Sequence, residues 1–153
     1  MARKLTEFLI VHCAATKPSM DIDIKEIDSW HRKRGFFSVG YHFVLKRDGT
    51  RQIGRSLDEV GGHAKGFNHR SIGICLVGGV KEEDHTIAEN NFTNEQWVEL
   101  EKLIVELLRT YPIAKVIGHN QISKKDCPSF DVQTYLKDKS FKESGCEKPL
   151  SIG

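Results

Sequence analysis

Short apolar runs alternate along this chain with segments of helical periodicity, and this alternation restricts the possible folds. Apolar runs of about four to eight residues bounded by turn signals are typical of buried strands, whereas apolar positions three and four residues apart are typical of amphipathic helices. Strands and helices intermixed in this way, with one hairpin, favour layers of helices on a mixed sheet. The sequence therefore predicts an α/β fold with a central mixed β-sheet flanked by helices.

Five segments are expected to form strands: Phe8–Ala14, Val39–Lys46, Arg51–Arg55, Ile72–Val77 and Lys115–Gly118. The second and third are joined by Arg47–Thr50, whose Asp-Gly pair is a strong hairpin signal. The first and the fourth are interpreted as buried strands because they are mainly apolar. A Gly- and His-bearing loop, Gly61–His69, leads into the fourth strand, and the last strand delivers His119 at its end.

Three segments are expected to be helical. Ile24–Arg34 follows a capping arrangement and is ended by Gly35. Thr93–Gln96 is a capping box before a second helix, and Asp131–Asp138 can form a short third one. The second helix carries one broad apolar stripe, which predicts that it packs on the core: Trp97, Leu100, Leu103, Ile104, Leu107 and Leu108.

The length of 153 residues favours a single domain, 1–153, with a sizeable core. Residues 8–139 are expected to form that core, and Ser140–Gly153 a loose tail. Lys and Arg number 23 against 21 Asp and Glu, a balance that argues against a dedicated nucleic-acid binder. The chain has no run of about 18 apolar residues, so we expect neither a membrane span nor a membrane partner.

The N-terminus and the cysteines indicate a protein that begins in a cytoplasm. Glu7 and His12 bracket a short apolar run, which is too brief for the hydrophobic region of a secretory signal peptide. The cysteines form neither a C-x-x-C pair nor a dense framework, so reduced or metal-bound thiols are favoured over disulfides: Cys13, Cys75, Cys127 and Cys146.

Seven histidines in one small domain suggest a metal site, but the spacings of zinc fingers and of H-E-x-x-H enzymes are absent. A catalytic zinc ion needs three protein ligands and one open position, which separated segments can also supply. His12 and His119 lie at strand positions, and Cys127 follows in a Pro-stiffened loop. Cys13 is expected to face away from His12, because side chains alternate along a strand. Spacing alone leaves open that each of these residues is structural.

Two further candidates have ordinary structural explanations. Tyr41 and His42 are neighbours on an expected strand, so Tyr41 would share the side of Phe43 and Leu45, which favours core packing. The pair Lys124–Lys125 lies in an expected loop, where lysines are usually solvated. The chain has no G-x-S-x-G elbow and no paired carboxylates, so serine hydrolase and glycosidase chemistry have no support.

The ordered set of motifs resembles the zinc-dependent N-acetylmuramoyl-L-alanine amidases of the type 2 family. The similarity covers most of the chain through seven pieces: Ile10–Ser19, Trp30–His31, Val39–Phe43, Lys46–Thr50, His63–Asn68, Ser71–Gly79 and Cys127–Phe130. Each piece alone is common, whereas their order is specific. Within that family they are most similar to the lysozymes of T-odd coliphages, which implies a phage endolysin whose fold is related to peptidoglycan-recognition domains.

The resemblance implies one zinc ion with three protein ligands: His12, His119 and Cys127. The catalytic Tyr and Lys of the family fall on Tyr41 and Lys125, and His63, from the loop that matches the cleft wall, is a candidate substrate contact. The implied reaction hydrolyses the amide between N-acetylmuramic acid and L-alanine in peptidoglycan. Relatives often carry Pro where this chain has Lys124, so Lys125 is chosen by its spacing to Cys127.

The resemblance also implies other partners and one alternative. Related peptidoglycan-recognition domains that lack the ligating Cys bind cell wall without cutting it, so a non-catalytic binding module is the alternative function. The similar phage lysozymes also bind and inhibit a phage RNA polymerase, which makes that enzyme an expected second partner. A monomeric endolysin without a signal peptide is expected in the host cytoplasm and would reach the wall after a holin-type membrane lesion.

Overall fold

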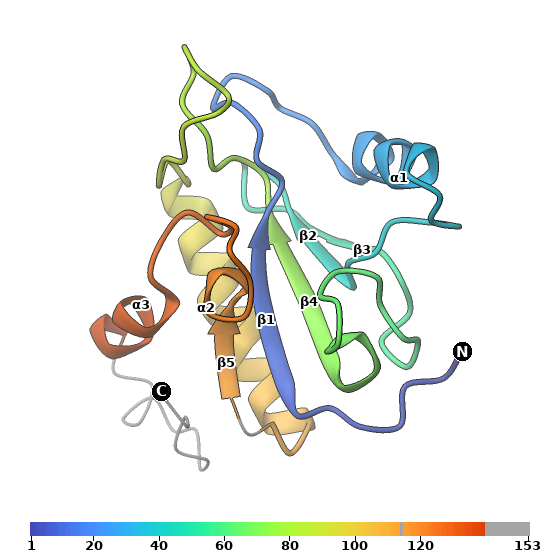
Figure 1. Ribbon diagram of the computed structural model, residues 1–153. Coiled ribbons are helices and arrows are strands. Elements are labelled where there is room, and N and C mark those ends of the chain that lie inside the picture. The colour runs from blue at the N-terminus through green and yellow to red at the C-terminus, as the bar shows by residue number, and fades with distance from the viewer. Residues whose placement is uncertain (114, 140–153) are drawn as a thin grey trace.

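The computed structural model describes residues 1–113 and 115–139 (Figure 1). Its elements in chain order are β1 (Phe8–Cys13), α1 (Ile24–Lys33), β2 (Phe43–Leu45), β3 (Arg51–Ile53), the 3-10 turn η1 (Asn68–Arg70), β4 (Ser71–Leu76), α2 (Asn94–Thr110), β5 (Lys115–Gly118), the 3-10 turn η2 (His119–Gln121) and α3 (Val132–Asp138). The expected tail Ser140–Gly153, which includes Cys146, lies outside the described residues. Within the described part of the chain, no helix combines the length and apolarity needed to cross a membrane.

The strands form one five-stranded sheet in the order β3-β2-β4-β1-β5. β1 pairs in parallel with both β4 and β5, and β2 pairs in parallel with β4, whereas the edge strand β3 runs antiparallel as the hairpin partner of β2. Leu9, Ile10 and Val11 of β1 are wholly buried, because both faces of this parallel strand are covered. The predicted α/β fold with a mixed sheet and flanking helices is confirmed.

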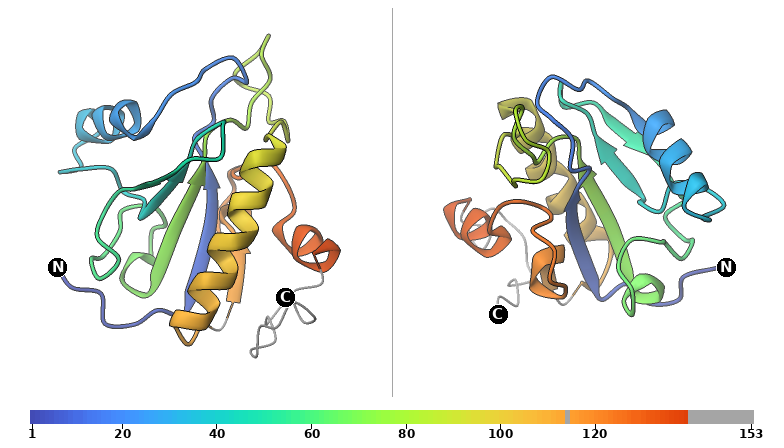
Figure 2. Two further views of the ribbon diagram at one scale, coloured as in Figure 1. Left: turned by 180° about the vertical axis from the view of Figure 1, so that it is seen from behind. Right: turned by 45° about the horizontal axis from the view of Figure 1, so that its top comes forward.

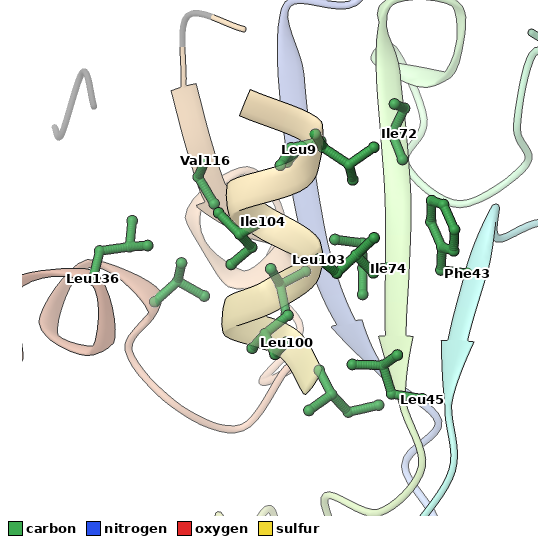
Figure 3. Packing of buried hydrophobic residues seen from close by; sticks show 14 of the residues in the cluster. Leu9, Phe43, Leu45, Ile72, Ile74, Leu100, Leu103, Ile104, Val116 and Leu136 are labelled. Carbon is green, nitrogen blue, oxygen red and sulfur yellow. The ribbon is translucent and has the colours of Figure 1, made fainter. Parts of the chain in front are cut away.

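Helix α2 covers one face of the sheet and forms the main core with it. The helix lies behind the sheet in Figure 1 and in front of it in the left view of Figure 2, and Figure 3 shows its leucines directed at the strands. The predicted apolar stripe is buried, apart from the half-buried Trp97. The shared core includes alternate residues of three strands and the stripe of α2: Leu9, Val11, Phe43, Leu45, Ile72, Ile74, Leu100, Leu103 and Ile104.

The opposite face of the sheet is covered by α1 and by the loop before β4. Ile27 of α1 packs with Val44 of β2, and Ala64 of the loop packs with Ile10 of β1. His12 follows Ile10 by two positions, so its side chain points to this same face, away from α2. The face that α2 does not cover therefore receives the buried polar side chains of β1.

The segment before β2 is less regular than predicted. Only Phe43–Leu45 of the expected strand Val39–Lys46 is regular. Just before it, the amides of the consecutive residues Gly54 and Arg55 both donate hydrogen bonds to this segment, which interrupts the alternating hydrogen-bond pattern of an antiparallel strand pair. Tyr41 consequently packs with the cluster on the α1 side. The prediction that Tyr41 shares the side of Phe43 and Leu45 is wrong, since strict alternation fails at this point. The other predicted strand and helix ends agree within about two residues.

Candidate metal centre and active site

β1 and β5 bring two histidines together at the carboxyl ends of adjacent parallel strands. Val11 lies opposite Gly118 in the strand register. The residues that follow them, His12 and His119, are therefore neighbours, and their ring centroids lie 4.5 Å apart. The side chains are 1% and 9% exposed, respectively, so both rings are largely shielded from water.

Cys127 reaches the same place from the loop between η2 and α3. The backbone N–H of Cys13 donates to Cys127 Sγ over 3.2 Å, and Ser129 Oγ donates to the carbonyl oxygen of Gly79 over 2.8 Å. Gly79 has a φ of +107°, and a Cβ at this position would lie 2.6 Å from Cys13 Sγ. Glycine at position 79 thus lets the loop close against the end of β1.

The donor atoms and their spacing fit a zinc ion. Ligand atoms of His12, His119 and Cys127 all lie within 4.8 Å of one another, and Cys127 Sγ lies 3.7 Å from His12 Nδ1. Tetrahedral zinc holds N and S ligand atoms roughly 3.3–3.6 Å apart, given its usual bond lengths. Two imidazoles and one thiolate also leave a fourth position open, as catalytic sites require. Cys13 lies in the core on the α2 side, on the opposite face from His12 as alternation predicts.

Burial controls the protonation of these three side chains. Burial and the neighbouring imidazoles lower the pKa of His12, while burial and then the ammonium group of Lys125 lower the pKa of His119. Both rings are therefore neutral near pH 7 and have a lone pair to offer a metal. A hydrogen bond with the side chain of Cys13, followed by burial, raises the pKa of Cys127, whereas the backbone N–H of Cys13 acts in the opposite direction. A metal ion must therefore displace the thiol proton when it binds.

Tyr41 and Lys125, the two expected catalytic residues, both lie near the cluster. The ring centroid of Tyr41 is 5.1 Å from that of His12. Burial, followed by the thiol groups around it, raises the pKa of Tyr41, so its hydroxyl group stays protonated at neutral pH. Lys125 lies in the exposed loop before Cys127, and its positive charge acts on both candidate histidine ligands.

His63 makes a contact that the sequence analysis missed. The sequence predicted a contact to substrate, which stays a prediction, whereas the structure places His63 Nδ1 2.8 Å from His12 Nε2. Gly73 carries the signal that could have revealed this contact, because a glycine inside an apolar strand often marks the close approach of another group. A Cβ on Gly73 would lie 2.6 Å from the His63 ring.

Two other buried histidines support the backbone around the site. His31 Nδ1 accepts a hydrogen bond from the N–H of Gly40 over 2.8 Å. His42 Nδ1 accepts one from the N–H of Gly73 over 3.1 Å, and its Nε2 lies 2.8 Å from the carbonyl oxygen of Glu59. These ring nitrogens are engaged in hydrogen bonds to the backbone, so we interpret His31 and His42 as structural residues.

Residues 2–130 match the family described as N-acetylmuramoyl-L-alanine amidase. The chain belongs to this family. This amidase is 47% identical over 133 residues to the endolysin of Escherichia phage T7, and the match covers 87% of each protein. It is also 27% identical to a solved structure, N-acetylmuramoyl-L-alanine amidase LysC from Clostridium intestinale; that match covers 88% of this chain and 85% of the other, with a TM-score of 0.75.

The amidase also shares its fold with peptidoglycan-recognition proteins. A solved structure of peptidoglycan recognition protein-LE in complex with tracheal cytotoxin, a monomeric peptidoglycan of the diaminopimelic acid type, matches with a TM-score of 0.71 at 22% identity. That match covers 92% of this chain and 83% of the other, and it concerns the fold alone. The predicted family and its relationship to peptidoglycan-recognition domains are confirmed.

Proposed function

We propose that this amidase is a phage endolysin that cleaves the amide between N-acetylmuramic acid and L-alanine in bacterial peptidoglycan, with one zinc ion as cofactor. The strongest support is the convergence of His12, His119 and Cys127 in a chain of the amidase family. The similar protein of phage T7 is an endolysin, and the recognition protein of the same fold binds a peptidoglycan fragment. A single catalytic domain, residues 1–153, carries the activity in this proposal.

The three converging residues would hold the zinc ion through two imidazole nitrogens and one thiolate sulfur. A bound zinc ion would supply Lewis acidity, which polarises a carbonyl group and lowers the pKa of bound water toward about 7. The neutral rings of His12 and His119 contribute lone pairs. The N–H of Cys13 donates to Cys127 Sγ, and this hydrogen bond favours the charged thiolate that metal binding requires.

Tyr41 and Lys125 act on the reacting groups. The neutral phenol of Tyr41 hydrogen-bonds the attacking water and aligns it with the scissile carbonyl carbon. The ammonium group of Lys125 stabilises the oxyanion that develops as the water adds, a contribution typically worth about a hundred- to a thousandfold in kcat. The proton that the water loses as it adds is transferred to the alanine nitrogen. The C–N bond then breaks, which leaves a carboxylate on the lactyl group and a free amine on alanine.

Several expectations rest on the sequence resemblance and remain predictions. They are the binding of a phage RNA polymerase, a monomeric state, and passage from the host cytoplasm to the wall through a holin-type lesion. The peptidoglycan-cleaving activity can be tested without any of these partners, because purified wall material is a sufficient substrate.

The decisive experiment incubates purified sacculi with the zinc-loaded protein and identifies new free amino groups by their N-terminal residue. We expect alanine amino groups to appear and to vanish when a chelator removes the metal. A Cys127→Ser variant at the same concentration serves as the matched control and should release none. If the protein sediments with sacculi but releases no amines, the amidase proposal fails and the non-catalytic binding module takes its place.

A further inference from the structure

A chain of hydrogen bonds leads from the sheet interior to the candidate ligand His12. Ser71 Oγ donates to the carbonyl oxygen of Phe67 over 2.8 Å and lies 3.2 Å from His63 Nε2. His63 Nδ1 in turn lies 2.8 Å from His12 Nε2. The backbone carbonyl of Phe67 is thus connected to the candidate metal ligand His12 through one hydroxyl group and one imidazole ring.

The donor and the acceptor in each of these hydrogen bonds follow from the number of protons that each group can donate. The single hydroxyl proton of Ser71 is used on the Phe67 carbonyl, so Ser71 Oγ can only accept from His63 Nε2–H. His63 Nδ1 then carries a lone pair and accepts from His12 Nε2–H. His12 Nδ1 is left with a free lone pair, and this is the atom that lies 3.7 Å from Cys127 Sγ.

The protein builds a dedicated cradle for the His63 ring. A Cβ on Gly73 of β4 would lie 2.6 Å from His63 Cγ, and one on Gly61 would lie 2.6 Å from His63 Cδ2, so two glycines make room for the ring. Asn68 Oδ1 accepts from the backbone N–H groups of His63 and Ala64, each over 2.8 Å, and holds the loop in place. The contact with His12 is therefore a built feature of the fold.

We infer that His63 is a positioning residue that fixes His12 in the tautomer and orientation whose Nδ1 faces the metal. This inference rests on the proposed function, because it concerns the zinc ligand named there. Partners of this kind typically strengthen metal binding by about ten- to a hundredfold. The role differs from the predicted substrate contact, because it acts through His12 and requires no substrate.

The test measures metal affinity instead of turnover. Zinc affinity of the full chain is determined by competition with a chromogenic chelator, and the Co²⁺-substituted protein is examined for its d–d absorption bands. We expect His63→Phe, which keeps a ring in the cradle but lacks the acceptor, to lower zinc affinity about ten- to a hundredfold and to alter the Co²⁺ bands. His63→Asn should recover much of the affinity, since Asn Oδ1 can take the place of the imidazole Nδ1 as acceptor.

Two controls separate this role from others. His69→Phe changes an exposed histidine of the same loop and should leave zinc affinity unchanged, while Ser71→Ala should weaken it by a smaller factor. Wild-type zinc affinity in His63→Phe together with a raised KM for peptidoglycan fragments would overturn the inference in favour of a substrate contact. If the wild-type chain bound no zinc, or bound it equally well after Cys127→Ser, the proposed function itself would fail.

Discussion

Lys124 and Lys125 are adjacent in one exposed loop, yet the structure relates Lys125 in particular to the candidate histidine ligands. After burial, the charge of Lys125 also lowers the pKa of both His12 and His119, so its ammonium group acts electrostatically on both candidate ligands. A lysine that acts on the site in the resting protein can also act on an oxyanion formed there. Variants of Lys124 and Lys125 can therefore serve as a matched pair, with Lys124 as the control.

We expect Lys125→Ala to lower kcat about a hundredfold or more while zinc content and KM change little, because the lost interaction exists mainly in the transition state. Lys124→Ala is the control and should retain most activity. The measurement is the rate of alanine amino-group release from sacculi, with bound zinc determined on the same samples. Normal activity in Lys125→Ala and its loss in Lys124→Ala would show that Lys124, and not Lys125, is the catalytic lysine.

Cys127→Ser should retain the fold but bind zinc weakly and lose hydrolysis, because a neutral hydroxyl group replaces a thiolate ligand. Zinc stoichiometry after dialysis and thermal unfolding of the metal-free protein together check this expectation. Cys75→Ala, which changes a fully buried thiol outside the candidate ligand set, should keep the metal. A zinc-replete, active Cys127→Ser protein would remove Cys127 from the ligand set.

The residue-level predictions succeeded where a simple geometric rule applied. Alternation along β1 correctly predicted that Cys13 faces away from His12. The position of His12 beside His119 depends on the pairing of β1 with β5, which the strand patterns alone did not predict. The side occupied by Tyr41 was predicted wrongly, because irregular pairing with Gly54 and Arg55 cannot be read from a strand pattern. The contact between His63 and His12 was missed since it depends on how a loop folds over the sheet.

At the scale of elements, the amino-terminal end of α2 joins the helix to the sheet through one side chain. The predicted capping box is present, with Gln96 Oε1 accepting from the N–H of Thr93 over 2.9 Å. Gln96 Nε2 also donates to the carbonyl oxygens of Leu45 and Val77, over 3.1 and 2.9 Å. The box was predictable from local sequence, whereas these links to β2 and β4 depend on tertiary packing.

Gln96→Leu should therefore destabilise the protein by roughly 2–4 kcal/mol, because it removes three hydrogen bonds and leaves the N–H of Thr93 without its side-chain acceptor. The carbonyl oxygens of Leu45 and Val77 each keep one other donor, the N–H of Val77 and Arg47 Nη1. Thr93→Ala, which removes the cap alone, should cost about 1 kcal/mol. Urea unfolding at constant m-value measures both, with the exposed Glu95→Gln as a control expected to change little. Equal losses for the two variants would mean that the links to the sheet contribute nothing beyond the cap.

For the molecule as a whole, buried histidines link stability to pH. Burial lowers the pKa of His42 from 6.5 to about 4, so below pH 6.5 the unfolded chain takes up a proton that the folded protein excludes. The associated stability is fully present above pH 6.5 and is lost as the pH falls toward 4, up to roughly 3 kcal/mol. The fold thus becomes weaker under mild acid, before most carboxylates titrate.

We expect the urea midpoint of the metal-free protein to fall between pH 7 and pH 5, and to fall less steeply in His42→Asn. Asn Oδ1 can still accept from the N–H of Gly73, while its amide does not titrate in this range. The quantity compared is the change of the urea midpoint with pH, since the wild-type and His42→Asn proteins also differ in absolute stability. Parallel slopes for the two proteins would exclude His42 as a source of the pH dependence.

The topology also sets the order in which the chain can become active during translation. His12 and Cys127 are 115 positions apart, and β1, which emerges first, lies between strands that are made much later. A ribosome therefore exposes His12 long before either of its partners exists. The proposed zinc site cannot be completed until nearly all of the described chain has been synthesised, so we expect unfinished chains to carry no working hydrolase.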